Sequence, residues 1–198
     1  MQESVMVTDA NWLNKNFGED HNHVIRVNVE EFLNLIENNY KFIPRNIAET
    51  SNAYKQIVSY CLITYRDKIF ITQRTSKQTE KRLHNRFSVG IGGHISSVDQ
   101  NSSDIVISGM LRELFEEVKI PQEYSCNFFG IINDNSSEVN SVHTGVCFVI
   151  QLKTEECNII ETEKMHGFWV NKDELNMYKD NLEGWSSILL NSYFEDKI

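Results

Sequence analysis

Residues 92–121 carry the most information about the fold of this chain, and their sequence is GGHISSVDQNSSDIVISGMLRELFEEVKIP. A β-rich run over residues 87–94 leads into the two glycines, which predicts a strand that ends in a tight turn. After a polar loop, apolar residues recur at helical spacing over residues 104–118, which predicts one helix. Strands followed by helices in this way are typical of α/β and α+β domains.

Three carboxylates share one face of the predicted helix. At about 100° per residue, Glu113, Glu116 and Glu117 fall within one arc. The other side carries the apolar stripe that we expect to pack on a sheet, formed by Ile107, Leu111, Leu114 and Val118. Like charges at these spacings repel, and the helix dipole disfavours acids near the C-terminal end. A hard divalent cation would offset this repulsion. The alternative is a solvated acidic face beside Arg112 and Lys119.

The stretch resembles the box of the Nudix hydrolases. That pattern is a glycine, five residues, a glutamate, seven residues, Arg-Glu, an aliphatic residue, any residue, Glu-Glu, any residue, a glycine and an aliphatic residue. Gly93 corresponds to the first glycine, and the second half is matched in register by Arg112, Glu113, Leu114, Glu116, Glu117 and Ile120. Gly92 and His94 resemble the entrance of the family's loop. The resemblance implies an α/β (α+β) fold, a Nudix-like α/β/α sandwich with a mixed central sheet. This domain would span residues 56–198, with residues 1–55 as an N-terminal extension packed on it.

Two departures from the box matter. Lys119 stands where the box has its last glycine, and we expect Pro121 to stop the helix instead. The loop is about five residues longer than the pattern, which leaves the first acid ambiguous between Asp99 and Asp104. The former keeps the spacing from the first box glycine, and the latter keeps the spacing to the box arginine. We prefer Asp104, because a rigid helix fixes its position relative to the glutamates. Its alternative role is a helix N-cap.

The resemblance also implies a role for each matched residue. Glu113, Glu116 and Glu117 would bind Mg²⁺ or Mn²⁺, together with the backbone carbonyl of Gly92. Arg112 would hold a glutamate in position by a salt bridge. The implied reaction is hydrolysis of a diphosphate linkage in a nucleoside-diphosphate-type substrate, by attack of water at phosphorus. The expected enzyme is therefore a Nudix-type pyrophosphohydrolase or phosphoesterase acting on a small molecule.

Further candidates lie outside the box. Family members often add a base from a later loop, and Glu163, with Glu161 beside it, is placed for this role. Glu138 near His143 is a second option, and a plain surface carboxylate is the alternative for each. His94 and His143 could line the pocket or be structural histidines. Four cations before the two glycines could hold phosphate oxygens or be ordinary surface charge, namely Arg74, Lys81, Arg82 and Arg86.

The rest of the chain predicts a sheet with few helices. Strands are expected over residues 57–65, 68–74, 128–133, 142–152 and 167–170, with a hairpin turn at Arg66-Asp67. Helices are expected over residues 30–39, from about Lys172, and over residues 185–195. Residues 5–7 form a β-like run, and residues 12–23 are expected to be irregular. Pro44 ends the helical pattern of the extension, because the residue before a proline avoids the helix.

The composition disfavours some classes of partner. The net charge is −9, whereas nucleic acids and anionic membranes select basic surfaces. No apolar run reaches the roughly 18 residues of a membrane span, and the N-terminus lacks a signal-peptide pattern. The four cysteines form no C-x-x-C pair and are expected to be buried, reduced thiols. We therefore expect a cytoplasmic protein. Its oligomeric state stays open, and the extension could form a homodimer contact or a lid.

The neighbourhood of the box also resembles a branch described as predicted Nudix phosphoesterases. The resemblance rests on residues 73–75, 81–84 and 90–94, and on the later residues 132–134 and 138–143. Isopentenyl-diphosphate isomerase shares the fold, but its pattern needs a cysteine where this chain has Gly93-His94. A non-catalytic nucleotide-sensing or interaction module on the same fold is the other alternative. Such modules usually lose box glutamates, and this chain keeps all three.

Overall fold

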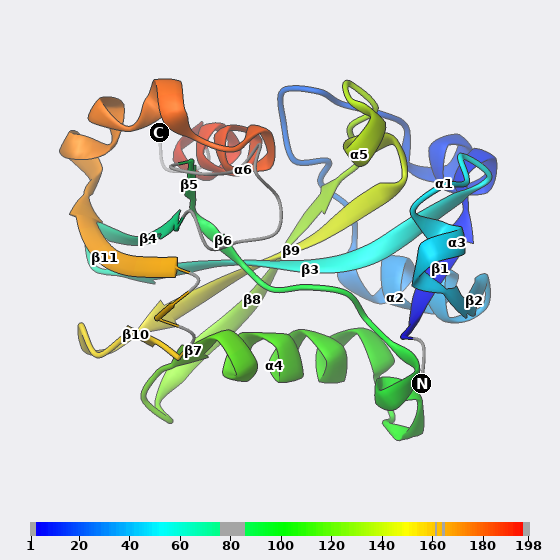
Figure 1. Cartoon of the computed structure of the whole chain (residues 1–198), viewed down its shortest axis with the longest axis horizontal. Helices are drawn as coiled ribbons and strands as arrows, with labels where there is room; N and C mark the ends of the chain where they lie inside the picture. The colour runs from blue at the N-terminus through cyan, green and yellow to red at the C-terminus, as the bar shows by residue number, and fades with distance from the viewer. Residues whose placement is uncertain (1–2, 76–85, 161, 164, 196–198) are drawn as a thin grey trace.

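The computed structural model describes residues 3–75, 86–160, 162–163 and 165–195, and Figure 1 shows the chain. The strands are β1 (Ser4–Asp9), β2 (Tyr40–Pro44), β3 (Tyr54–Tyr65), β4 (Lys68–Arg74), β5 (Phe87–Ser88), β6 (Gly90–Ile91), β7 (Val118–Lys119), β8 (Tyr124–Ile132), β9 (His143–Leu152), β10 (Asn158–Ile159) and β11 (Met165–Asn171). The α-helices are α1 (Ala10–Phe17), α2 (Val29–Glu37), α3 (Arg45–Ala48), α4 (Ile105–Glu117), α5 (Glu138–Ser141) and α6 (Gly184–Glu195). Short 3-10 helices are η2 (Ser97–Asn101), η3 (Lys172–Met177) and η4 (Lys179–Asn181).

Strand β3 organises the central mixed sheet. One edge of β3 pairs in parallel with β9, from Gln56 opposite His143 to Thr64 opposite Gln151, and β8 continues the sheet antiparallel to β9. The other edge is divided among β1, β6 and β4, all antiparallel to β3. Strand β11 extends the sheet beyond β4, and β2 extends it beyond β1. Strand β3 is nearly continuously buried, as expected for a strand covered on both faces.

Helices cover the two faces of this sheet, and each face has its own apolar core. Helix α4 lies on one face, where its buried residues Ile105, Val106, Met110 and Leu114 join a cluster with residues of β3. Helix α6 lies across the other face, where Ile188, Leu189 and Leu190 join a second cluster (Figure 1). This layering confirms the predicted α/β/α sandwich with a mixed central sheet.

The N-terminal segment adds strands to the same sheet. Strand β1 pairs with β3, from Val7 opposite Gln56 to Asp9 opposite Tyr54, and β2 pairs with β1. Phe32 and Ile36 of α2 are fully buried in the core cluster that also holds β3 residues. Contact of this segment with the rest of the molecule is therefore extensive, although the boundary between residues 55 and 56 stays a prediction.

Several local expectations were wrong. Part of the stretch expected to be irregular forms α1, because the Asp9 carboxylate accepts a hydrogen bond from the Trp12 amide at 2.8 Å and caps the helix. Residues 40–44, where only the end of a helical pattern was expected, form β2. The strand expected over residues 87–94 is divided into β5 and β6, and the helix expected from Lys172 is a 3-10 helix.

The hairpin predicted at Arg66-Asp67 is confirmed, since Tyr65 pairs with Lys68 across it. The helices expected over residues 30–39, 104–118 and 185–195 are present as α2, α4 and α6. Within the described ranges, no helix has both the length and the apolar character that a membrane crossing would require.

Candidate active site

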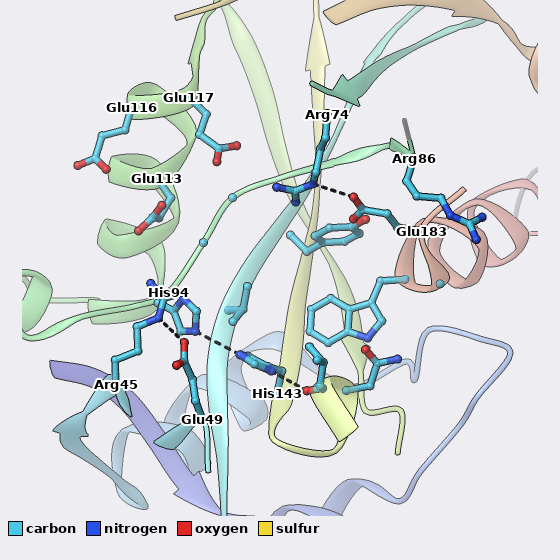
Figure 2. Close-up of a pocket in the computed structure, with 18 of the residues that line it drawn as sticks. Arg45, Glu49, Arg74, Arg86, His94, Glu113, Glu116, Glu117, His143 and Glu183 are labelled. Atoms are coloured by element: carbon cyan, nitrogen blue, oxygen red, sulfur yellow. Dashed lines mark hydrogen bonds and ion pairs between the residues drawn. The ribbon is translucent and has the colours of Figure 1, made fainter. Parts of the chain in front are cut away.

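A cavity of about 780 Å³ opens between α4, the middle of β3 and the start of α6. Figure 2 shows the carboxylates of α4 on one wall and Arg74, Arg86 and Glu183 on another. The remaining wall residues come from distant parts of the chain, namely Glu3, Arg45, Glu49, Val58, Tyr60, Gly92, Gly93, His94, Arg112, Val139, Asn140, His143, Leu182, Gly184 and Trp185. The divided edge of β3 explains the position of the cavity. Between its pairing with β1 and with β6, the segment of Gly93 lies against β3, where the Ser59 amide donates to the Gly93 carbonyl at 2.8 Å.

Helix α4 presents Glu113, Glu116 and Glu117 to the cavity, as the box resemblance implied (Figure 2). The helix begins after Asp104, whose side chain accepts from the Ile107 amide at 2.9 Å. Its buried residues are Ile105, Val106, Gly109, Met110 and Leu114, so the packed face is rotated slightly from the predicted stripe. Because these residues hold one side of the helix against the sheet, the three glutamates are placed together on another side.

Arg112 connects the loop, the glycine turn and the glutamates. Its Nε and Nη2 atoms donate to the two carboxylate oxygens of Asp99 at 2.8 and 2.9 Å, and Nη2 also donates to the His94 carbonyl at 3.0 Å. Its Nη1 atom donates to Glu113 Oε1 at 2.7 Å and lies 3.4 Å from Glu116 Oε2. The hydrogen bonds that Arg112 donates to Asp99, followed by the contact with Glu113, raise the pKa of Arg112 above its ordinary value. The guanidinium is thus a fixed positive charge at the base of the acidic wall.

The acid that pairs with Arg112 is Asp99, and our preference for Asp104 was wrong. The Asp99 side chain is only 4% exposed and makes a bidentate pair with the guanidinium. Asp104 instead has the alternative role named for it, the N-cap of α4. The long loop explains the difference, because η2 folds back so that Asp99 also accepts from the Ser96 amide at 2.9 Å. The spacing of residues in the sequence does not reveal that the loop folds back toward Arg112.

Both glycines of the turn are required by close contacts. A Cβ atom at Gly93 would lie 2.3 Å from Glu113 Oε2, so a larger residue would displace the carboxylate that Arg112 holds. Gly92 has a φ of 146°, and a Cβ there would lie 2.3 Å from the Ser59 carbonyl oxygen. Burial raises the pKa of Glu113, and the hydrogen bond from Arg112 opposes this shift. The turn and the arginine therefore orient Glu113 from two sides.

The residues at this wall fit a hard divalent cation by their chemistry. Carboxylate and carbonyl oxygens are the ligands that Mg²⁺ takes in proteins, and Glu113, Glu116, Glu117 and the Gly92 carbonyl supply only oxygens. In the described part of the chain, no three His, Cys, Asp or Glu side chains stand close enough to hold one ion as they are. Sharing an ion would therefore require side-chain rotation, which the 60% exposed Glu116 side chain is free to make.

The expected phosphate-binding arginines separate into two groups. Arg74 and Arg86 line the cavity. Arg74 Nε donates to Glu183 Oε1 at 2.8 Å, and Arg86 Nη1 donates to the Asp180 carbonyl at 3.1 Å. Arg82 lies outside the described residues, as do Lys81 and Glu161.

The two carboxylates considered as a base are not at the cavity wall. Glu163 does not line the cavity, and its backbone carbonyl accepts from Thr75 Oγ1 at 2.8 Å. Glu138 begins α5 and does not line the cavity either, although the next two residues of the chain, Val139 and Asn140, do. The geometry therefore favours neither residue as the base.

His94 and His143 both line the cavity and contact each other. Their Nε2 atoms are 3.3 Å apart, and His143 Nδ1 lies 2.7 Å from the Val139 carbonyl (Figure 2). A carbonyl can only accept, so His143 carries its proton on Nδ1 and its Nε2 accepts from His94 Nε2. Burial lowers the pKa of His94 to about 3 and also lowers the pKa of His143. Both rings are therefore neutral at physiological pH.

Sequence reasoning missed the residues that complete the cavity. Arg45 lies 3.0 Å from Glu3 and 2.8 Å from Glu49, and all three come from the N-terminal segment. At another side, Tyr60 and Trp185 meet edge to face with ring centroids 5.6 Å apart. No local pattern marks these side chains, because only the pairing of β1 and the packing of α6 bring them to the glutamates.

A solved structure shares this whole architecture. Tm1382, which is assigned to the Nudix hydrolases, is 32% identical in sequence and superposes with a TM-score of 0.81, covering 94% of this chain and 95% of Tm1382. The chain belongs to the Nudix hydrolases. This Nudix hydrolase is also 32% identical over 169 residues to Protein YmaB of Bacillus subtilis (strain 168), with 82% of each chain covered. No protein-family model matches the sequence.

A more distant structure supports the fold alone. DR0079 of Deinococcus radiodurans is 13% identical, with a TM-score of 0.54 over 77% of this chain and 91% of DR0079. The likeness to Tm1382 confirms that the Nudix fold predicted from the box describes this enzyme. The comparisons support the general activity of the family, hydrolytic cleavage of a pyrophosphate linkage.

Proposed function

We propose that this Nudix hydrolase cleaves the diphosphate linkage of a nucleoside-diphosphate-type substrate, with Mg²⁺ or Mn²⁺ as its cofactor. One observation carries the proposal. The three glutamates of α4 and the cations Arg74 and Arg86 line the same cavity. An acidic wall suits a divalent cation, and guanidinium groups suit phosphate oxygens. A diphosphate bridging metal and arginines satisfies both walls at once.

The chain's own residues hold and orient the reacting groups. Glu113, Glu116 and Glu117, with the Gly92 carbonyl, would hold the ion, which when bound neutralises diphosphate charge and lowers the pKa of coordinated water. Arg112 keeps Glu113 in position through the 2.7 Å ion pair. Arg74 and Arg86 would bind oxygens of the diphosphate.

The proposal is tested by metal-dependent turnover. Nucleotide sugars, dinucleoside polyphosphates, ADP-ribose and oxidised nucleotides are incubated with the full-length protein and Mg²⁺, Mn²⁺ or EDTA, and product release is measured. We expect hydrolysis of at least one substrate that stops in EDTA. Glu116→Gln and Glu117→Gln should each lower kcat by about 100-fold or more, as expected for loss of a catalytic group. Glu30→Gln, at an exposed position of α2 outside the cavity, is the matched control.

Two results would contradict parts of this proposal. Ligand binding without turnover and without a metal requirement would indicate a sensing module instead of a hydrolase. Glu163 stays our predicted catalytic base from the later loop. A rate for Glu163→Gln within about twofold of the unchanged protein would remove Glu163 from the mechanism.

We also propose a cytoplasmic setting. Cys61, Cys147 and Cys157 are buried free thiols, which suits a reducing compartment. The predicted homodimer is a separate proposal, and light scattering of the full-length protein would decide it.

A further inference from the structure

A buried lysine lies behind one wall of the cavity. Lys55, the second residue of β3, is 1% exposed, whereas each of the other lysines that the structure describes is half-buried or exposed. Burying an ammonium group is costly even when it is hydrogen-bonded, and an apolar side chain of similar size at such a position is often as stable or more stable. Packing alone therefore does not explain a lysine at this position.

The Lys55 ammonium group donates to three acceptors in one segment of the chain. Its Nζ atom donates to the side-chain oxygen of Asn135, to the Asn140 carbonyl at 3.1 Å and to the His143 carbonyl at 3.3 Å. An ammonium group has three donors, so all of them are used. These acceptors lie within residues 135–143, which we call the α5 segment because it contains the single turn of α5 between β8 and β9. Two acceptors are main-chain oxygens, so the ammonium group holds the backbone of the α5 segment to β3.

The opposite side of the α5 segment forms part of the cavity wall. Val139, Asn140 and His143 line the cavity, and His143 contacts His94 there (Figure 2). The pairing of β3 with β9 begins only at His143, so it does not hold the earlier part of the segment. A helix of one turn is not stable by itself, and its position therefore depends on tertiary contacts.

A second contact holds the same residue of the segment. The Nδ2 atom of Asn140 donates to Asp134 Oδ2 at 2.5 Å, while the Asn140 carbonyl accepts from Lys55. Asp134 is 2% exposed and also accepts from the Ser136 amide at 2.8 Å. The wall residue Asn140 is thus held by an anion through its side chain and by a cation through its backbone.

The groups around the ammonium determine the pH range in which it is charged. Burial lowers the pKa of Lys55 to about 8, and the carboxylates of Glu19 and Asp134 oppose this shift. Asp134 also lies 2.7 Å from His21 Nδ1, and burial keeps the nearby His143 ring neutral. Lys55 is therefore charged at neutral pH and loses its proton in mildly alkaline solution. The neutral amine has one donor fewer, and uncharged hydrogen bonds are roughly half as strong as charge-assisted ones.

We propose that Lys55 is a positioning residue, whose ammonium group holds the α5 segment against β3 and so fixes the cavity wall that this segment forms. Lys55 itself does not line the cavity, so it acts through the segment and not on the substrate. The inference rests on the proposed function in one respect, because the substrate of that reaction is expected to contact this wall. Loss of the charge should raise KM and leave kcat nearly unchanged, since the glutamates of α4 stay in place.

Hydrogen–deuterium exchange of the full-length protein tests the hold on the segment without any substrate. Lys55→Met keeps the length of the side chain and removes its charge. The amides of Asn140 and Ser141, which donate within the α5 segment, should exchange about 10-fold or more faster in this variant, and the amides of α4 should not change. Lys153→Met, at a lysine whose side chain is 70% exposed and lies outside the cavity, is the matched control and should exchange like the unchanged protein.

Turnover separates positioning from a merely structural role. For any diphosphate that the protein hydrolyses, Lys55→Met should raise KM about 10-fold at neutral pH, with kcat within about threefold. In the unchanged protein and in Lys153→Met, KM should rise between about pH 7 and pH 9 as Lys55 loses its proton. The KM of Lys55→Met should already be high and should stay constant within about twofold over this range, because methionine does not titrate.

Global unfolding would not produce this rise in KM. The pKa of Lys55 in the folded state lies below the ordinary value of 10.5 that applies to the unfolded chain. The contribution of Lys55 to stability is therefore complete above about pH 10.5 and is lost as the pH falls toward about 8. Raising the pH from about 7 to 9 does not destabilise the fold through this group, so the rise in KM reports the position of the α5 segment.

Each result supports or overturns the inference. Equal exchange of the α5 segment in Lys55→Met and in the unchanged protein would overturn it, and so would faster exchange with an unchanged KM. If Lys55→Met does not fold, the KM of the unchanged protein decides, because a rise between about pH 7 and pH 9 supports the inference and a constant value overturns it. Faster exchange in a protein that hydrolyses none of the tested diphosphates would support the hold on the segment and contradict only the proposed function.

Discussion

At the scale of single residues, the Arg112 side chain is held by hydrogen bonds to several partners in the candidate site. It bonds Asp99 through two nitrogen atoms, Glu113 through a third, and the His94 carbonyl as well. A planar guanidinium can make these contacts simultaneously and an ammonium cannot. The matched arginine of the box is therefore a structural link between loop, turn and helix.

The two aspartates before α4 should respond differently to the loss of charge. Asp99→Asn breaks a nearly buried ion pair and should lower the free energy of unfolding by about 3 kcal/mol, with a loss of metal-dependent activity. Asp104→Asn should change stability by less than about 0.5 kcal/mol, because asparagine caps helices as well as aspartate does. Urea unfolding and turnover of both variants measure this. Equal effects of the two changes would show that the assignment of Asp99 is wrong.

His143 should make stability depend on pH. Burial lowers its pKa, Arg45 and Lys55 act in the same direction, and the Val139 carbonyl and Glu49 oppose the shift. The folded state therefore binds a proton less readily than the unfolded state. The corresponding stability is complete above the unfolded pKa of about 6.5 and is lost as the pH falls from there toward the lower folded pKa.

The measurement compares urea unfolding at about pH 7.5 and pH 5.5. The unchanged protein should lose stability on acidification, and His143→Asn should lose less, because asparagine does not titrate. If both proteins lost the same free energy of unfolding, the titrating group would lie elsewhere.

At the scale of elements, the turn before η2 and helix α4 form one unit. The turn lies directly against Glu113, and a Cβ atom at Gly93 would lie 2.3 Å from the Oε2 atom of this glutamate. Backbone and carboxylate are thus positioned relative to each other by close packing. The contact between the glycine turn and this one glutamate is the physical reason for the spacing between the glycine and the glutamates in the box.

Gly93→Ala should therefore act through Glu113. We expect the fold to persist by circular dichroism, and metal-dependent turnover to fall by about 100-fold, as displacements near 1 Å can cause. Glu113→Gln should have a similar effect. The double variant should be no worse than the more severe single variant, because both changes remove one function. Strictly multiplicative losses would show that Gly93 acts independently of Glu113.

At the scale of the whole molecule, the N-terminal segment is joined to the sheet and the cavity. Strand β1 pairs with β3, Leu13 and Phe32 are fully buried, and Arg45 and Glu49 line the cavity. Removing this segment would expose the edge of β3 together with apolar core. Exposed edges and apolar surface favour aggregation.

A protein consisting of residues 56–198 should therefore be insoluble or unfolded, as judged by solubility and circular dichroism. The full-length variant Arg45→Met is the control. It should remain folded, since its ion pairs are exposed and contribute little to stability. A folded, active protein of residues 56–198 would instead support the predicted boundary after residue 55 as a true domain limit.

The sequence alone was sufficient for the superfamily, the sandwich and the acidic face of α4. The superfamily and the sandwich follow from the resemblance to the Nudix box. The acidic face follows from local periodicity, since residues three and four apart on a helix share a face whatever surrounds them. The spacing of residues in the sequence was not sufficient to place side chains in a long loop, where the chain is free to bend. The choice between Asp99 and Asp104 depended on the path of a long loop, and the sequence predicted the wrong one.

Only the tertiary structure decided which distant residues complete the cavity. Arg45 lies at the cavity because β1 and β2 join the sheet. Trp185 lies at the cavity because α6 packs against β9 at Gly145. Such contacts join residues tens of positions from one another, and they depend on packing of the whole chain rather than on neighbours in sequence. The local sequence of α4 therefore determined the chemistry of the acidic wall. The tertiary packing of distant segments determined the shape of the cavity that this wall faces.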